Sequence, residues 1–176
     1  MKQRTIAIVG GKKVGKTTTS ENLIAELVKR GYKVAAIKHI SEPEWTIDTP
    51  GKDTYRFAQK GAKTLVVLAP NELVTIEKGK TEGISLSKLL SRAKGNDLVL
   101  IEGLKTTVAT KGNISKIVVV TSQLEAESAL KTYRPILAFS GPFNTETLTP
   151  SIPYVNALTE PARLADIVEK HVLKNS

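Results

Sequence analysis

The sequence predicts an α/β fold, with a mostly parallel central sheet flanked by helices and an added antiparallel hairpin. Three observations support this prediction. Apolar runs typical of strands alternate with amphipathic stretches along the chain. Residues 97–101 and 117–120 are almost continuously apolar, as expected for strands buried on both faces. A glycine-rich octet at residues 10–17 lies between a predicted strand and a predicted helix.

The elements follow from hydrophobic periodicity and from turn residues. The predicted strands cover residues 5–9, 33–37, 64–68, 72–77, 97–101, 117–120 and 135–139, and the predicted helices cover 16–29, 53–60, 84–93, 123–131 and 159–173. The first strand, helix and second strand form a βαβ unit, which favours parallel pairing. The 64–68 run predicts a buried strand, and its short link to the next strand favours an antiparallel hairpin. Thr159 is a plausible N-cap of the last helix.

Length and composition limit the function classes. The 176 residues fit a single domain over residues 1–176, of a size usual for nucleotide-binding domains. The absence of cysteine excludes disulfides and thiolate metal sites. The net charge of +9 suggests a polyanionic partner such as a nucleotide. Aromatic residues are too few for an interleaved nucleic-acid surface, so no nucleic-acid function is expected. No stretch approaches a membrane span or a secretory signal, which favours a cytoplasmic protein without a membrane partner.

The octet Gly10-Gly11-Lys12-Lys13-Val14-Gly15-Lys16-Thr17 matches the phosphate-loop pattern of P-loop NTPases. Its glycines allow backbone N–H groups to curl around phosphate oxygens, and the following helix adds its positive N-terminal end. We expect Lys16 to reach the β- and γ-phosphates, and the Thr17 hydroxyl to bind Mg²⁺. The phosphate-binding candidates are Gly11, Lys12, Lys13, Val14, Gly15, Lys16, Thr17 and Thr18.

Acidic residues elsewhere complete the predicted site. Glu102 follows four apolar residues and precedes a glycine, the pattern of an acid that holds Mg²⁺ at the end of a central strand. His39 ends the second strand, where it could bind metal or phosphate or be an ordinary strand-end histidine. Asp48 and Asp53 follow in a loop and could bind Mg²⁺ or orient water. Asp53 could equally cap the next helix.

The chain resembles the MobB family, the molybdopterin-guanine dinucleotide biosynthesis proteins B. The residues that carry the resemblance are Gly10 to Thr18, Lys38-His39, Asp48-x-Pro50-Gly51-Lys52-Asp53-Thr54-Tyr55, Gly61-Ala62 and Leu98 to Lys105. The resemblance implies a GTP-binding protein, usually dimeric, with weak GTPase activity. It would act with the MobA nucleotidyltransferase in attaching GMP to molybdopterin.

In this interpretation GTP and Mg²⁺ are the cofactors. Lys16, Asp48 and Asp53 are the catalytic candidates, and Thr17, Glu102 and Asp53 are the metal ligands. His39, Lys52 and Lys105 are added to the binding residues, with the two lysines facing a second anionic ligand. Whether the chain is a true GTPase or an adaptor that presents nucleotide is left open.

The residues alone do not distinguish GTP from ATP. A small-molecule kinase or a general ATPase on the same scaffold is therefore the alternative function. Trp45 lies on a polar loop and could stack on a ligand, form an interface or pack in the core.

Overall fold

A computed structural model describes residues 3–174. Its internal contacts divide the chain into two compact units. The first unit runs through His39 and resumes at Leu86, and the second unit covers Ile40–Ser85. Each unit is described by itself below.

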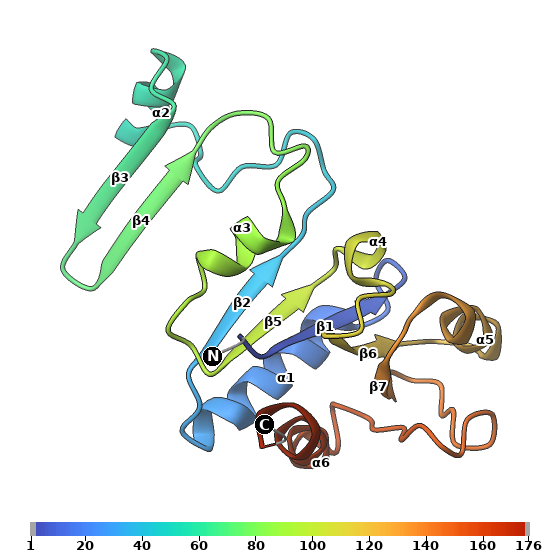
Figure 1. Ribbon diagram of the computed structural model, residues 1–176. Coiled ribbons are helices and arrows are strands. Elements are labelled where there is room, and N and C mark those ends of the chain that lie inside the picture. Colours follow the sequence, from blue (N-terminus) through green and yellow to red (C-terminus); the bar gives the residue numbers. More distant parts are fainter. Residues whose placement is uncertain (1–2, 175–176) are drawn as a thin grey trace. The chain divides into compact units, whose positions relative to one another are not determined.

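The first unit is built on a five-stranded parallel sheet with the strand order β2-β5-β1-β6-β7 (Figure 1). The strands are β1 (Thr5–Gly10), β2 (Val34–Lys38), β5 (Leu98–Glu102), β6 (Ser115–Val119) and β7 (Ile136–Ser140). In the β2–β5 register Lys38 lies opposite Glu102, and in the β1–β5 register Ile8 lies opposite Glu102. The carboxyl ends of these strands therefore meet at one edge of the sheet, where ligands of α/β proteins bind.

Helices cover both faces of this sheet. They are α1 (Lys16–Lys29), α3 (Leu86–Ser91), α4 (Lys105–Val108), α5 (Gln123–Thr132) and α6 (Pro161–Val168), and α6 continues as a π-helical segment over Glu169–Leu173. Residues of β1 alternate between the two faces, as the period of a strand requires. Ile6 and Ile8 belong to the core that includes α1 and α6, whereas Ala7 and Val9 belong to the core that includes α3, α4 and α5.

An ionic network ties α1 to the C-terminal helix. The Arg30 guanidinium lies 2.7 Å from Asp166 and 3.0 Å from Glu169. Glu169 also accepts a 2.6 Å hydrogen bond from the Tyr32 hydroxyl and pairs with Lys174. The Tyr32 hydrogen bond is the main reason that the pKa of Glu169 falls to about 2, with Lys174 contributing next. A carboxylate with several donors is favoured in its charged form.

The second unit consists of α2 (Asp53–Gln59) and an antiparallel hairpin of β3 (Thr64–Ala69) and β4 (Glu72–Glu77). One face of the hairpin carries Leu65, which is buried. The opposite face carries Val66 and the facing pair Leu68 and Leu73, and these two leucines are 84% and 68% exposed. The prediction of a buried strand over 64–68 is therefore wrong for three of its five side chains, Thr64, Val66 and Leu68, which are exposed.

The predicted fold class is confirmed: the sheet is parallel, helices flank it, and a separate antiparallel pair is present. Two local differences have simple reasons. Helix α4 was not expected, because four residues are too few to show helical periodicity. Glu160, not Thr159, is the N-cap of α6, and it forms no side-chain capping bond. None of the helices within residues 3–174 has the length and apolar composition needed to cross a bilayer.

Candidate functional site

The phosphate loop connects β1 to α1, and its glycines have distinct structural tasks. A Cβ atom on Gly10 would lie 2.4 Å from the carbonyl oxygen of Val119, closer than any side chain tolerates. Gly15 is the N-cap of α1 and has a φ of 99°, a conformation that favours glycine. Between them, Lys13 has a positive φ of 57°. The loop therefore folds tightly against β6 and then turns into the helix.

Free backbone donors line this loop. Within residues 3–174, no carbonyl or side chain accepts a hydrogen bond from the backbone N–H groups of residues 11–17, and the first backbone bond of the helix start runs from Thr19 to Gly15. Helix α1 has no acidic residue in its first turn, and no side chain caps it. The partial positive charge at the helix N-terminus is thus uncompensated, which suits an anionic ligand.

Lys16 is the first residue of α1, and its ammonium group donates a hydrogen bond back to the Gly11 carbonyl. The side chain therefore folds over the loop. Burial is the main cause that lowers the pKa of Lys16 below its ordinary value. The nearby Glu102 carboxylate opposes this shift, whereas the ammonium groups of Lys105 and Lys38 add to it. An anion in the loop would relieve the crowding of these cations.

Thr17 and Glu102 meet at the end of the sheet. The Thr17 hydroxyl donates a 3.0 Å hydrogen bond to Glu102 Oε1, although the two residues are 85 positions apart in the chain. The Lys38 ammonium lies 3.1 Å from Thr17 Oγ1 and 3.2 Å from Glu102 Oε1. A hydroxyl and a carboxylate this close offer the oxygen ligands that Mg²⁺ prefers alongside phosphate oxygens. The Lys38 ammonium already contacts both oxygens, so the pair fits a bound cation such as a metal ion.

The segment after Glu102 is tightly fitted. The backbone N–H of His39 donates to the Glu102 carbonyl at 2.9 Å, which extends the β2–β5 ladder by one step. A Cβ atom on Gly103 would lie 3.1 Å from His39 Cβ, and Gly103 has a φ of 94°. Leu104 also has a positive φ, 49°, and is the N-cap of α4. This bend carries Lys105 to the side of the phosphate loop.

A cavity of about 340 Å³ opens beside the phosphate loop, between β6 and α5. The cavity is lined by Gly10, Gly11 and Lys105, by residues 118–120 at the end of β6, and by one face of α5. Glu125 also lines it, and its Oε2 atom is held by the backbone N–H and hydroxyl of Thr121 at 2.7 and 2.9 Å. The cavity combines an apolar floor with one cationic and one anionic group, a lining typical of small-molecule sites.

The residues of the 48–53 loop lie in the second unit and have local partners there. Asp48 is buried, accepts a 2.7 Å hydrogen bond from the Thr54 hydroxyl and lies 3.3 Å from the Lys78 ammonium. Asp53 is exposed and pairs with Arg56 at 3.1 Å within the first turn of α2. Lys52 is the N-cap of this helix and is exposed.

A Pro-Gly turn shapes the same loop. Pro50 and Gly51 occupy the central positions of a turn, and the N–H of Lys52 donates to the Thr49 carbonyl at 3.4 Å. Gly51 has a φ of 97°, which the second central position of a type II turn requires. Trp45, on the preceding stretch, is 55% exposed and so is not a core residue of this unit.

Comparison with known proteins assigns the family. The family model described as "MobB: Molybdopterin guanine dinucleotide synthesis protein B" matches residues 5–140. The chain belongs to the MobB family. It is 37% identical over 120 residues to a putative molybdopterin-guanine dinucleotide biosynthesis adapter protein of Methanocaldococcus jannaschii, covering 66% of this chain and 47% of the relative. It is also 37% identical over 102 residues to the adapter protein of Haemophilus influenzae, covering 57% of this chain and 56% of the relative. The chain thus spans about half the length of these curated relatives.

Solved MobB structures share the fold. Bacillus subtilis MobB matches with a TM-score of 0.72 at 22% identity, covering 98% of this chain and 99% of that one. A crystal structure of molybdopterin-guanine biosynthesis protein B matches with a TM-score of 0.69 at 23% identity, covering 94% and 97% of the two chains. The predicted architecture, a mostly parallel sheet flanked by helices with an added antiparallel pair, is therefore shared with solved MobB proteins.

The structure brings part of the predicted site together. The phosphate-loop residues, Thr17, Glu102 and Lys105 converge in the first unit around Lys16. His39 lies beside Glu102 through its backbone. Asp48, Lys52 and Asp53 belong to the second unit, and their catalytic and binding roles stay predictions. Sequence reasoning missed Lys38 as a site residue, although its place at the carboxyl end of a strand next to β5 was a usable signal.

Proposed function

We propose that this protein is a nucleotide-binding adapter in the synthesis of molybdopterin guanine dinucleotide, with GTP and Mg²⁺ as its ligands. The observation that carries the proposal is the phosphate loop with its free N–H groups, closed by Lys16 and bordered by the Thr17–Glu102 pair. Family membership supplies the pathway, because the family model and the curated relatives are both named for this synthesis.

Magnesium would be held by Thr17 and Glu102 together with phosphate oxygens. When bound, the ion neutralises phosphate charge and fixes the position of the terminal phosphates. Lys16 would bind the β- and γ-phosphates, and the N–H groups of the loop would surround the β-phosphate. Gly11 to Thr18 thus bind and orient the nucleotide.

Turnover is expected to be weak. Phosphate-loop proteins that wait for an arginine from a partner hydrolyse their nucleotide slowly. In this proposal Asp48 and Asp53 keep the role predicted from the sequence, in which one of them orients the attacking water. The exposure of Asp53 supports it as the more accessible of the two, since Asp48 is buried against Thr54 and Lys78. An adapter role does not depend on this step.

A second ligand is part of the proposal. The pathway joins a guanine nucleotide to a phosphorylated pterin, and a MobA-type nucleotidyltransferase would be the partner that performs the transfer. The cavity beside the loop supports a pterin site in the first unit, because Lys105 can pair with a phosphate and Glu125 can accept from ring N–H groups.

We further propose that the protein is a homodimer. The hairpin of the second unit supports this, because Val66, Leu68 and Leu73 expose an apolar face. A two-stranded sheet also leaves an unpaired edge on each strand. A second copy with the same face would cover these side chains through an isologous interface.

The deciding experiment is isothermal titration of the protein with non-hydrolysable GTP and ATP analogues in Mg²⁺ buffer. Preference for the GTP analogue is expected, and addition of the MobA-type enzyme and of molybdopterin to the GTP complex would then test the partners. Equal affinity, or preference for ATP, would contradict the guanine-specific role and favour a kinase or general ATPase. Folded Lys16→Ala protein with unchanged affinity would contradict any role of the phosphate loop.

A further inference from the structure

Lys38 is the last residue of β2, and its side chain reaches over to the end of β5. The register places Lys38 opposite Glu102 on the neighbouring strand. The ammonium lies 3.2 Å from Glu102 Oε1, 3.5 Å from Glu102 Oε2 and 3.1 Å from Thr17 Oγ1. Three oxygens of two residues thus surround one ammonium group.

The same oxygens are proposed to hold Mg²⁺. Glu102 is a single carboxylate, and its side chain is only 13% exposed. The Lys38 ammonium contacts both of its oxygens and the Thr17 hydroxyl. A divalent ion bound to Glu102 and Thr17 would therefore compete with Lys38 for these oxygens.

We propose that Lys38 is an exchangeable internal cation of the metal site, a positioning residue that pairs with Glu102 and Thr17 until Mg²⁺ with nucleotide displaces it. The displaced ammonium then turns to the phosphate oxygens. This inference rests on the proposed function for the identity of the nucleotide, but the competition between Lys38 and a divalent ion does not depend on it.

The position of Lys38 allows such an exchange. Its side chain is 50% exposed, so it has room to move, and β2 is an edge strand of the sheet. Within residues 3–174, the Lys38 ammonium forms hydrogen bonds and ion pairs only with Thr17 and Glu102. A lysine has a flexible four-carbon stem, which lets the ammonium shift by several ångströms without a change in the backbone.

Lys38 would act in two ways, first as the partner of Glu102 and Thr17 and then as a cation beside the phosphates. Before nucleotide binds, Lys38 keeps Glu102 beside Thr17, so the two metal ligands are held together at 3.0 Å. Without Lys38 the little-exposed Glu102 carboxylate would lose its direct ion pair, which is unfavourable at such low exposure. When the metal arrives with the phosphates, the positive charge of Lys38 remains in the site and adds to that of Lys16.

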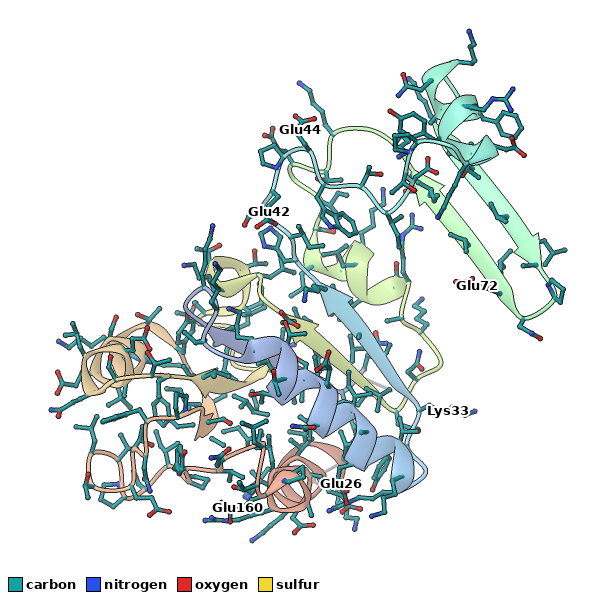
Figure 2. All side chains as sticks on the ribbon, turned by 180° about the vertical axis from the view of Figure 1, so that it is seen from behind. Glu26, Lys33, Glu42, Glu44, Glu72 and Glu160 are labelled. Atoms are coloured by element: carbon teal, nitrogen blue, oxygen red, sulfur yellow. The ribbon has the colours of Figure 1, made fainter. Side chains whose placement is uncertain are left out.

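The first test measures the divalent ion directly, on protein without nucleotide. Mn²⁺ serves as the probe, and free Mn²⁺ is followed by electron paramagnetic resonance. The Lys38→Met variant should bind Mn²⁺ about tenfold more tightly than the unaltered protein, because the competing cation is gone. The matched control is Lys33→Met, at the amino end of β2 (Figure 2), which should bind Mn²⁺ as the unaltered protein does.

The second test uses a fluorescent GTP analogue, titrated with Mg²⁺ and with EDTA. In the unaltered protein Lys38 compensates part of the phosphate charge, so removal of Mg²⁺ weakens binding only in part. In Lys38→Met the ratio of the two dissociation constants should rise about tenfold. Lys38→Arg, which keeps the charge, should restore a ratio near that of the unaltered protein.

The outcomes separate the two proposals. Equal Mn²⁺ affinity of a folded Lys38→Met variant and the unaltered protein would overturn the exchange, whatever nucleotide the protein binds. Tighter Mn²⁺ binding without any GTP binding would support the exchange and contradict the proposed function. Circular dichroism confirms that each variant is folded.

Discussion

The two units of this chain differ in how far their apolar side chains are buried. In the first unit, strands β1, β5 and β6 are buried along almost their whole length, and helices cover both faces of the sheet. Among the described residues of the second unit, Leu65 alone of the large apolar side chains is buried. Trp45, Phe57 and Leu68 are all more than half exposed. The first unit is therefore closed around its own core, and the second is covered on one face only.

This difference separates the proposed nucleotide site from the proposed dimer surface. The first unit carries the phosphate loop and a cluster of lysines around Glu102, held by a rigid sheet. The second unit has a hairpin that is too small to bury both of its faces, since two strands and a short helix provide little cover. An exposed apolar face of this kind suits the proposed dimer interface.

The largest effect is expected from Lys16→Ala, within the first unit. Nucleotide affinity should fall by about 100-fold, because the charged contacts to the β- and γ-phosphates are lost. The unfolding midpoint should stay nearly unchanged, since the Lys16 ammonium contacts only the Gly11 carbonyl among the described partners. Isothermal titration and thermal unfolding check the two statements, with Lys33→Met as the control.

The next effect concerns the buried carboxylate of the second unit. Asp48→Asn should destabilise that unit by about 2 kcal/mol, because a buried partner of Thr54 and Lys78 loses its charge. Hydrogen exchange resolved by residue should report the loss over 40–85 and not over the sheet. A drop in GTP turnover without any change in hydrogen exchange would instead favour the predicted catalytic role of Asp48.

A smaller effect is expected from the exposed hairpin face. Leu68→Asp should weaken the dimer about tenfold or more, because a charge would be buried in the isologous interface. Light scattering over a concentration series measures the dimer. Leu158→Asp is the matched control, since Leu158 is 68% exposed in the first unit. Equal dissociation of the two variants would contradict a dimer through the hairpin.

The smallest effect is a pH dependence in the first unit. The pKa of Glu169 is lowered from 4.5 to about 2, first by the Tyr32 hydroxyl and then by Lys174. The contribution of Glu169 to stability is therefore complete above its unfolded pKa and is lost as the pH falls from about 4.5 to about 2. The denaturant midpoint of Glu169→Gln should vary less over this range than that of the unaltered protein.

The sequence was most informative where structure is local. The phosphate loop, the βαβ unit and the acid at the end of β5 follow from residue spacing, and all lie where that spacing predicts. The place of Lys38 at a strand end was visible in the sequence, but its contact with Glu102 was not, because that contact depends on the pairing of β2 with β5, 64 residues apart. The exposure of Leu68 was also missed, since an apolar run does not tell which face of a strand is covered.

Asp48 and Asp53 illustrate another limit. Both have the residue type and the spacing expected of a metal or water ligand, but in the structure each has a partner within its own unit. A carboxylate that completes a turn or the first turn of a helix has the same sequence signature as one that binds a ligand. The catalytic roles of Asp48 and Asp53 and the metal-binding role of Asp53 therefore stay predictions.

The second unit is inserted between β2 and β5, and this has a consequence for how the chain folds. Strands β3 and β4 of the hairpin pair across a short turn. Strands β2 and β5 are far apart in the chain, since Lys33 and Asp97, which precede them and are hydrogen-bonded to each other, are 64 positions apart. Local pairings form early, and distant ones must wait for a long loop to close. The entropy of that closure grows only with the logarithm of loop length, so doubling the insert costs about 0.6 kcal/mol. Lineages can therefore enlarge, shrink or exchange the inserted hairpin while the nucleotide-binding sheet keeps its register.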